Sequence, residues 1–135
     1  MYLQLYLIII VGELHQQGGS AMLIFIIELI SLFIIPIVEI IIGKMKAKKE
    51  INKFIGYRSA KTMSSQEMWE IGQQLMKKYM SKAGIISLVI GIIGAIPCFF
   101  VNEVAVGIIV TVVVLIQTAI LLILVVKMDK EMKAK

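Results

Sequence analysis

Three long runs of apolar residues dominate the chain, at residues 22–42, about 84–101 and about 104–126. As a helix, the first run would measure roughly 31 Å, which matches the hydrocarbon core of a bilayer. The third run is rich in β-branched residues, but a single strand in lipid would leave its backbone groups unpaired, whereas a helix pairs them internally. The pattern therefore predicts an all-α integral membrane protein with three transmembrane helices.

The polar segments between these runs predict the orientation. All 14 Lys and Arg residues lie in a loop at 43–83 or in a tail at 127–135, and none lies in the tight turn at 102–103. Short loops that are rich in Lys and Arg stay in the cytoplasm. We therefore expect a cytoplasmic loop and C-terminal tail, and an N-terminus outside.

The first 21 residues are apolar but too short to span, and they lack the basic start of a signal peptide. The codons of Gln-Gly-Gly just before Met22 can contain a bacterial ribosome-binding sequence. One interpretation is that translation starts at Met22 and that 1–21 is a mis-called extension. The other is that Met1 is the true start and that the segment is a short interfacial element.

Residues 64–80 have the pattern of an amphipathic helix, because apolar side chains recur every three or four positions. Ser64 is a suitable N-cap, and Glu67 three residues later would complete a capping box. Beside a membrane, such a helix is expected in the interface, with Trp69 and Tyr79 at headgroup depth. An anchor and a helix that docks a partner protein share this pattern.

The short stretch before this helix interrupts the helical pattern. Gly56 permits a tight turn, and Ser59 and Thr62 have hydroxyls that can bond nearby backbone. Arg58 offers a planar fork of donors suited to phosphate or carboxylate. The stretch is either a self-contained turn, with Arg58 on a lipid phosphate or a loop carbonyl, or a contact site for a partner.

The run Gly-Tyr-Arg-Ser-x-x-Thr, followed by Glu-x-Trp and a Gln, resembles the signature of the SdpI family of small bacterial membrane proteins. The resemblance covers about residues 22–127 and implies a multi-pass protein of the bacterial cell membrane. Longer family members have additional spans that this chain lacks. The resemblance implies that the signature residues contact a partner or lipid. These residues are Gly56, Tyr57, Arg58, Ser59, Thr62, Glu67, Trp69 and Gln73.

The SdpI family is named for a protein that gives immunity to a secreted peptide toxin and that holds a transcriptional repressor at the membrane. The resemblance therefore implies immunity to, or sensing of, a membrane-active peptide toxin. The alternative is a small regulatory or scaffold subunit whose loop recruits a cytosolic partner such as a repressor. A small-residue spacing at Ser87, Gly91 and Ala95 favours close helix packing, within the hairpin or in a homo-oligomer.

Two carboxylates lie inside the first apolar run. Glu28 and Glu39 are 11 residues apart, near three helical turns, so they share a face. An acidic side chain at mid-span costs roughly 2.5–3.5 kcal/mol on insertion scales and usually marks function. Glu39 is close enough to the cytoplasmic end to reach water or a Lys. Glu28 would contact a toxin or bind a proton, or would form an interhelical hydrogen bond to Gln117 or Thr118.

The composition of the chain narrows the classes of function that remain. The chain is 59% hydrophobic, with one Cys and one His, so we expect no disulfide framework and no metal site built on His and Cys. It has no phosphate-binding loop and no nucleophile–His pair, so we expect neither an enzyme nor a cofactor. The basic run after the first span lacks a nucleic-acid motif and is expected to meet anionic lipid.

Overall fold

The computed structural model describes residues 9, 13, 21–45, 51 and 56–135, so the proposed extension at 1–21 lies almost wholly outside the described residues. These residues contain helices α2 (Ala21–Lys44), α3 (Gln66–Cys98) and α4 (Glu103–Lys133). Each is long and apolar enough to cross a membrane. The described parts of the chain contain no strand. The prediction of an all-α protein with three spanning helices is confirmed.

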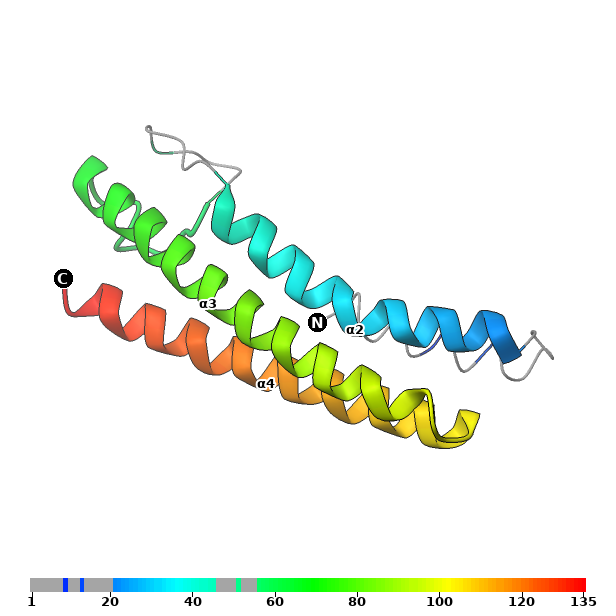
Figure 1. Ribbon diagram of the computed structural model, residues 1–135. Helices are drawn as coiled ribbons and strands as arrows, with labels where there is room; N and C mark the ends of the chain where they lie inside the picture. Colours follow the sequence, from blue (N-terminus) through cyan, green and yellow to red (C-terminus); the bar gives the residue numbers. More distant parts are fainter. Residues whose placement is uncertain (1–8, 10–12, 14–20, 46–50, 52–55) are drawn as a thin grey trace.

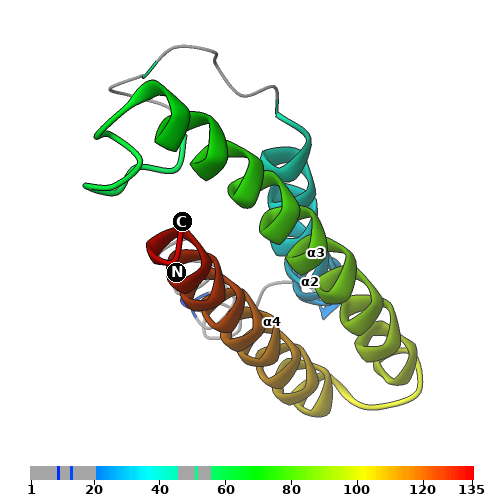
Figure 2. The ribbon, with the colours of Figure 1, turned by 90° about the vertical axis from the view of Figure 1, so that its left-hand side faces the viewer.

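The three helices run side by side and alternate in direction (Figure 1). The C-terminal ends of α2 and α4 and the beginning of α3 lie at one end of the bundle. A view turned by 90° shows the short turn between α3 and α4 at the opposite end (Figure 2). The described basic residues of the loop and the tail therefore lie at the same end.

The turn between α3 and α4 is short because both helices are capped there. The backbone N–H of Phe99 donates to the carbonyl of Ile96, 3.4 Å away, and ends α3. The side-chain oxygen of Asn102 accepts from the backbone nitrogen of Ala105 at 3.0 Å and starts α4. The predicted helical hairpin is thus present.

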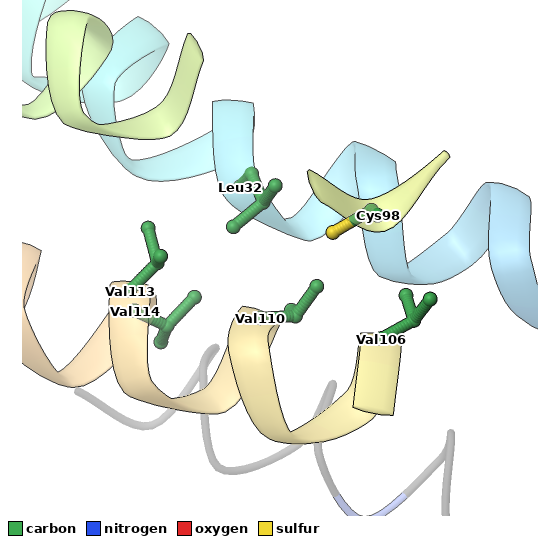
Figure 3. Packing of buried hydrophobic residues seen from close by; sticks show 6 residues of the cluster. All are labelled: Leu32, Cys98, Val106, Val110, Val113 and Val114. Carbon is green, nitrogen blue, oxygen red and sulfur yellow. The ribbon is translucent and has the colours of Figure 1, made fainter. Parts of the chain in front are cut away.

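The largest apolar cluster lies in the half of the bundle near this turn. Leu32 of α2 and Cys98 of α3 face a row of valines on α4 (Figure 3). Large apolar side chains such as Ile85, Ile93 and Leu122 are exposed on the outer faces of the helices. Their exposure is what a bundle surrounded by lipid requires, since the hydrocarbon of lipid solvates apolar side chains.

Glycines set the close approach of α3 to its neighbours. A Cβ at Gly84 would lie 2.6 Å from Ile40 Cγ1 and 3.0 Å from the carbonyl oxygen of Pro36, both in α2. A Cβ at Gly94 would meet the side chain of Val113 in α4. These small residues therefore serve packing within the chain, as small residues do in membrane bundles.

The segment 64–80 is not a separate interfacial helix, because α3 runs without a break from Gln66 to Cys98. No proline and no turn sequence separates its polar first half from its apolar second half, so the helix continues. The N-cap is Ser65, whose hydroxyl accepts from the backbone nitrogen of Met68 at 3.2 Å. The predicted cap, Ser64, instead donates to the carbonyl of Lys61, and the expected capping box with Glu67 is absent.

Candidate functional site

Residues 56–62, called the signature turn below, are fastened to α3 by the side chain of Gln73. The backbone nitrogen of Tyr57 donates to Gln73 Oε1 at 3.1 Å, and Gln73 Nε2 donates back to the carbonyl of Tyr57 at 3.0 Å. Gln73 is buried. One side-chain amide thus satisfies both polar groups of one backbone residue, which fixes the turn against the helix.

Gly56 allows this approach. Its φ of +122° is in a region that favours glycine, and a Cβ would lie 2.6 Å from Gln73 Oε1 and 2.9 Å from the Trp69 ring. The side chain of Trp69 is 0% exposed, so its ring is covered by protein and does not face lipid. Trp69 packs under the turn because Gly56 leaves room for its ring.

The turn also holds its own shape through its two hydroxyl residues. The backbone nitrogen of Ser59 donates to Thr62 Oγ1 at 2.7 Å, and the backbone nitrogen of Thr62 donates to Ser59 Oγ at 3.2 Å. Thr62 Oγ1 also donates to the carbonyl of Tyr57 at 3.2 Å. Thr62 is fully buried against Gly72 of α3, where a Cβ would overlap its methyl group.

Unlike Tyr57, Ser59 and Thr62, Arg58 makes no side-chain hydrogen bond within the described part of the chain. Its side chain is exposed, and among the described residues no hydrogen bond or ion pair holds its guanidinium. The expected loop carbonyl is therefore not its partner there. Glu67 is also exposed, in the first turn of α3, where a carboxylate interacts favourably with the helix dipole.

The signature turn docks on the C-terminal end of α4, a contact that the sequence did not predict. Tyr57 Oη donates to Asp129 Oδ1 at 2.9 Å, and Lys133 Nζ lies 2.7 Å from Asp129 Oδ2. Lys61 Nζ donates to the carbonyl oxygen of Lys133 at 2.9 Å. Burial raises the pKa of Tyr57, and the neighbouring carboxylate of Asp129 raises it further.

A second set of contacts joins the first half of α3 to the same end of α4. Tyr79 Oη donates to Glu131 Oε2 at 2.7 Å, and Lys78 Nζ lies 3.2 Å from Glu131 Oε1. Leu75 packs against Met128 and Met132. The only signal for this contact in the sequence is the apolar spacing Leu124, Met128 and Met132, which continues the buried face of the third span into the tail.

Inside the bundle, Gln117 joins all three helices. Its Nε2 donates to the carbonyl of Leu32 in α2 at 3.1 Å and to the carbonyl of Ser87 in α3 at 2.9 Å. The expected hydrogen bond from Gln117 to Glu28 is therefore absent, because both amide hydrogens are used elsewhere. The carboxyl of Glu28 lies instead beside Gly107 of α4, where a Cβ would be 3.1 Å from Oε1.

Glu39 is buried, with a side chain on the same face of α2 as Glu28, as the sequence predicted. The expectation that Glu39 reaches water or a Lys is wrong for the described residues. Its exposure is 3%, and neither carboxyl oxygen has a hydrogen-bond partner there. The hydroxyl of Ser87 in α3 faces this side chain.

The comparisons with known proteins agree with the resemblance of the signature turn. No curated protein and no solved structure matches the chain. A family model described as the SdpI/YfhL protein family matches residues 48–127. That range covers more than half of the chain and includes the signature turn, all of α3 and the apolar part of α4. With three spanning helices around this match, the chain is a multi-pass membrane protein that belongs to the SdpI/YfhL family.

Proposed function

We propose that this protein gives immunity to, or senses, a membrane-active peptide toxin at the bacterial cell membrane. The helices bind or exclude the toxin within the bilayer, and the signature turn reports or stabilises that state on the cytoplasmic side. The family and the three spanning helices support a membrane role. The distribution of Lys and Arg supports the cytoplasmic position of the turn.

The exposed guanidinium of Arg58 is the observation that carries this proposal. Its neighbours in the turn form hydrogen bonds within the chain, at Tyr57, Ser59 and Thr62. The side chain of Arg58 is exposed, on a backbone that Gln73 holds in place. A guanidinium binds phosphate and carboxylate through paired, charge-assisted hydrogen bonds. Arg58 would therefore contact a lipid phosphate or an acidic group of a partner.

Helix α3 supplies a physical connection between the membrane and this turn. Gln73 and Trp69, which hold the turn, and Ser87 and Gly91, which pack in the bundle, lie on one uninterrupted helix. A toxin that shifted this helix within the bilayer would move the support of the turn at the same time. An interface between two rigid elements transmits such shifts better than a flexible loop does.

The test is the survival of a sensitive bacterial strain that expresses the protein. Wild type, Arg58→Ala and Arg58→Lys are brought to equal membrane levels, and the cells are challenged with a panel of membrane-active peptide toxins. We expect protection by the wild type, loss with alanine and partial loss with lysine, which keeps the charge but not the planar fork. Equal protection by all three would contradict the role of Arg58, and protection by none would contradict immunity.

The second candidate is a regulatory subunit that recruits a cytosolic protein such as a transcriptional repressor. The docking of the turn on α4 favours it, because Tyr57 and Asp129 join two segments far apart in sequence into one surface beside Arg58. Here the full chain in detergent would retain a partner from cytosol, and Arg58→Ala would release it. Cells lacking the protein would then be no more sensitive to toxin.

A further inference from the structure

Three polar side chains, one from each helix, are buried in the bundle with oxygen atoms that have no hydrogen-bond partner among the described residues. These are both carboxyl oxygens of Glu39 in α2, the hydroxyl of Ser87 in α3 and Oε1 of Gln117 in α4. The side chains are 3%, 0% and 0% exposed. A buried oxygen that is left without a hydrogen-bond partner destabilises the folded state. We call these residues the buried polar site.

The orientation of Gln117 is fixed by its hydrogen bonds. Its Nε2 donates to the carbonyls of Leu32 and Ser87, which can only accept. Exchanging the amide nitrogen and oxygen would place an acceptor against two acceptors. Gln117 Oε1 is therefore fixed as an acceptor inside the bundle, and a hydrogen-bond donor or a cation must pair with it.

Glu39 brings the charge to this site. The hydroxyl of Ser87 faces the carboxyl of Glu39, but among the described residues neither group makes a hydrogen bond of ordinary distance and angle. No described Lys or Arg forms an ion pair with Glu39. Ser87 also joins the two other residues, because its backbone carbonyl accepts from Gln117.

The chemistry of these ligands selects a monovalent cation. All the free groups are oxygens, which hard cations prefer, and one carboxylate balances one positive charge. A proton on Glu39 would add one hydrogen-bond donor, and this alternative is separated from a cation by the experiment below. A neutral water molecule would leave the carboxylate charge uncompensated in a medium of low dielectric constant.

We propose that Glu39, Ser87 and Gln117 form an intramembrane binding site for one monovalent cation such as Na⁺. The bound ion contacts oxygens of all three helices and so links α2, α3 and α4 at one point. Glu39 lies five residues before α2 ends at Lys44, so the ion enters from the end of the bundle that carries the signature turn. This inference is independent of toxin immunity and revises the expectation that the chain binds no metal ion.

The test uses the full-length protein in lipid nanodiscs. Thermal unfolding is followed while Na⁺ replaces N-methylglucammonium at constant ionic strength, and binding of radioactive Na⁺ is measured on the same samples. We expect the Tm to rise with Na⁺ and to level off, because a ligand of the folded state stabilises it by mass action. Binding should be lost in Glu39→Gln and about tenfold weaker in Ser87→Ala, the loss of one ligand contact of about 1.4 kcal/mol.

Glu28→Gln is the matched control, because it neutralises the other buried carboxyl of α2 and should leave Na⁺ binding unchanged. Direct binding by the wild type keeps the proposal testable if Glu39→Gln does not fold. Absence of saturable Na⁺ binding would overturn the proposal, as would equal binding by Glu39→Gln. Infrared detection of a protonated Glu39 that persists in saturating Na⁺ would overturn it in favour of a proton site.

Discussion

The side-chain amide of Gln117 donates a hydrogen bond of 3.1 Å to the carbonyl oxygen of Leu32, four residues before Pro36. Proline has no N–H, so the carbonyl one turn earlier loses its intrahelical donor. In a bilayer, a freed carbonyl needs a donor from another part of the protein. Gln117 supplies that donor from α4, and Gly91 leaves the space, since a Cβ there would lie 3.1 Å from the same oxygen.

The first prediction is that Gln117→Leu destabilises the bundle by about 1–2 kcal/mol, with a smaller effect when Pro36→Ala is also present. Alanine restores the N–H at position 36, so the Leu32 carbonyl no longer depends on Gln117. A double-mutant cycle from reversible unfolding in mixed detergent, in buffer without Na⁺, measures the coupling. Equal costs of Gln117→Leu in both backgrounds would contradict the link.

The second prediction concerns the contact between α2 and α3 at Gly84. We expect Gly84→Ala to destabilise the protein by about 1–3 kcal/mol, because the new methyl group would meet backbone atoms of Pro36 and Ile40. Gly107→Ala is the matched control, since its methyl group meets only the flexible side chain of Glu28. Thermal unfolding of both variants checks this, and equal stability of the two would contradict it.

The third prediction separates the role of Gln73, which holds the signature turn against α3, from the role of the exposed Arg58. Gln73→Leu leaves the N–H and carbonyl of Tyr57 unpaired, at a cost of about 1–3 kcal/mol. The emission of Trp69, the only tryptophan, should shift to longer wavelength as the turn detaches and water reaches the ring. Arg58→Ala should change the stability by less than about 0.5 kcal/mol and leave the emission unchanged.

The spans and the signature were predictable because they depend on local properties of the sequence. Apolar length alone defines a helix in lipid, so the three spans followed from the hydropathy of the chain. The signature turn followed from Gly56, Ser59 and Thr62, whose roles are local conformation and hydrogen bonds within a few residues. That Arg58 has no partner among the described residues was not predictable, because a sequence does not show which loop groups come near it.

The relationships that the sequence did not predict depend on contacts between distant segments. Tyr57 and Asp129 are 72 residues apart, and only the packed bundle brings the tail to the turn. The burial of Trp69 under the signature turn was not predictable, because an amphipathic face has the same sequence pattern against lipid and against protein. Glu39 was expected to reach water, but it is buried and faces Ser87 of α3, 48 positions later in the sequence. The residues next to Tyr57, Trp69 and Glu39 in the sequence do not indicate these contacts.

The fourth prediction is a pH dependence of the contact between Tyr57 and Asp129. The pKa of Tyr57 is raised above its ordinary value of 10.0 by burial and then by Asp129. The folded state therefore favours the protonated hydroxyl. Its contribution to stability is complete below pH 10.0 and is lost as the pH rises through the higher folded value.

The measurement for this fourth prediction is an NMR titration of the tyrosine ring carbons. Asp129→Asn should move the titration of Tyr57 down, toward its ordinary value. Glu131→Gln is the matched control, because Glu131 bonds Tyr79 and not Tyr57, so it should leave the titration of Tyr57 in place. A titration of Tyr57 at its ordinary value in the wild type would contradict the docked arrangement.

The fifth prediction is the orientation of the bundle in the cell membrane. The described Lys and Arg residues of the loop and tail lie at one end, and the turn around Asn102 lies at the other. With Cys98, the only cysteine, changed to Ala, single cysteines are placed at Lys61 and Asn102. In intact cells, a membrane-impermeant maleimide should label Asn102→Cys, and it should label Lys61→Cys only after the membrane is opened, because basic loops stay in the cytoplasm. The reverse pattern would place the signature turn outside and would contradict contact with a cytosolic partner.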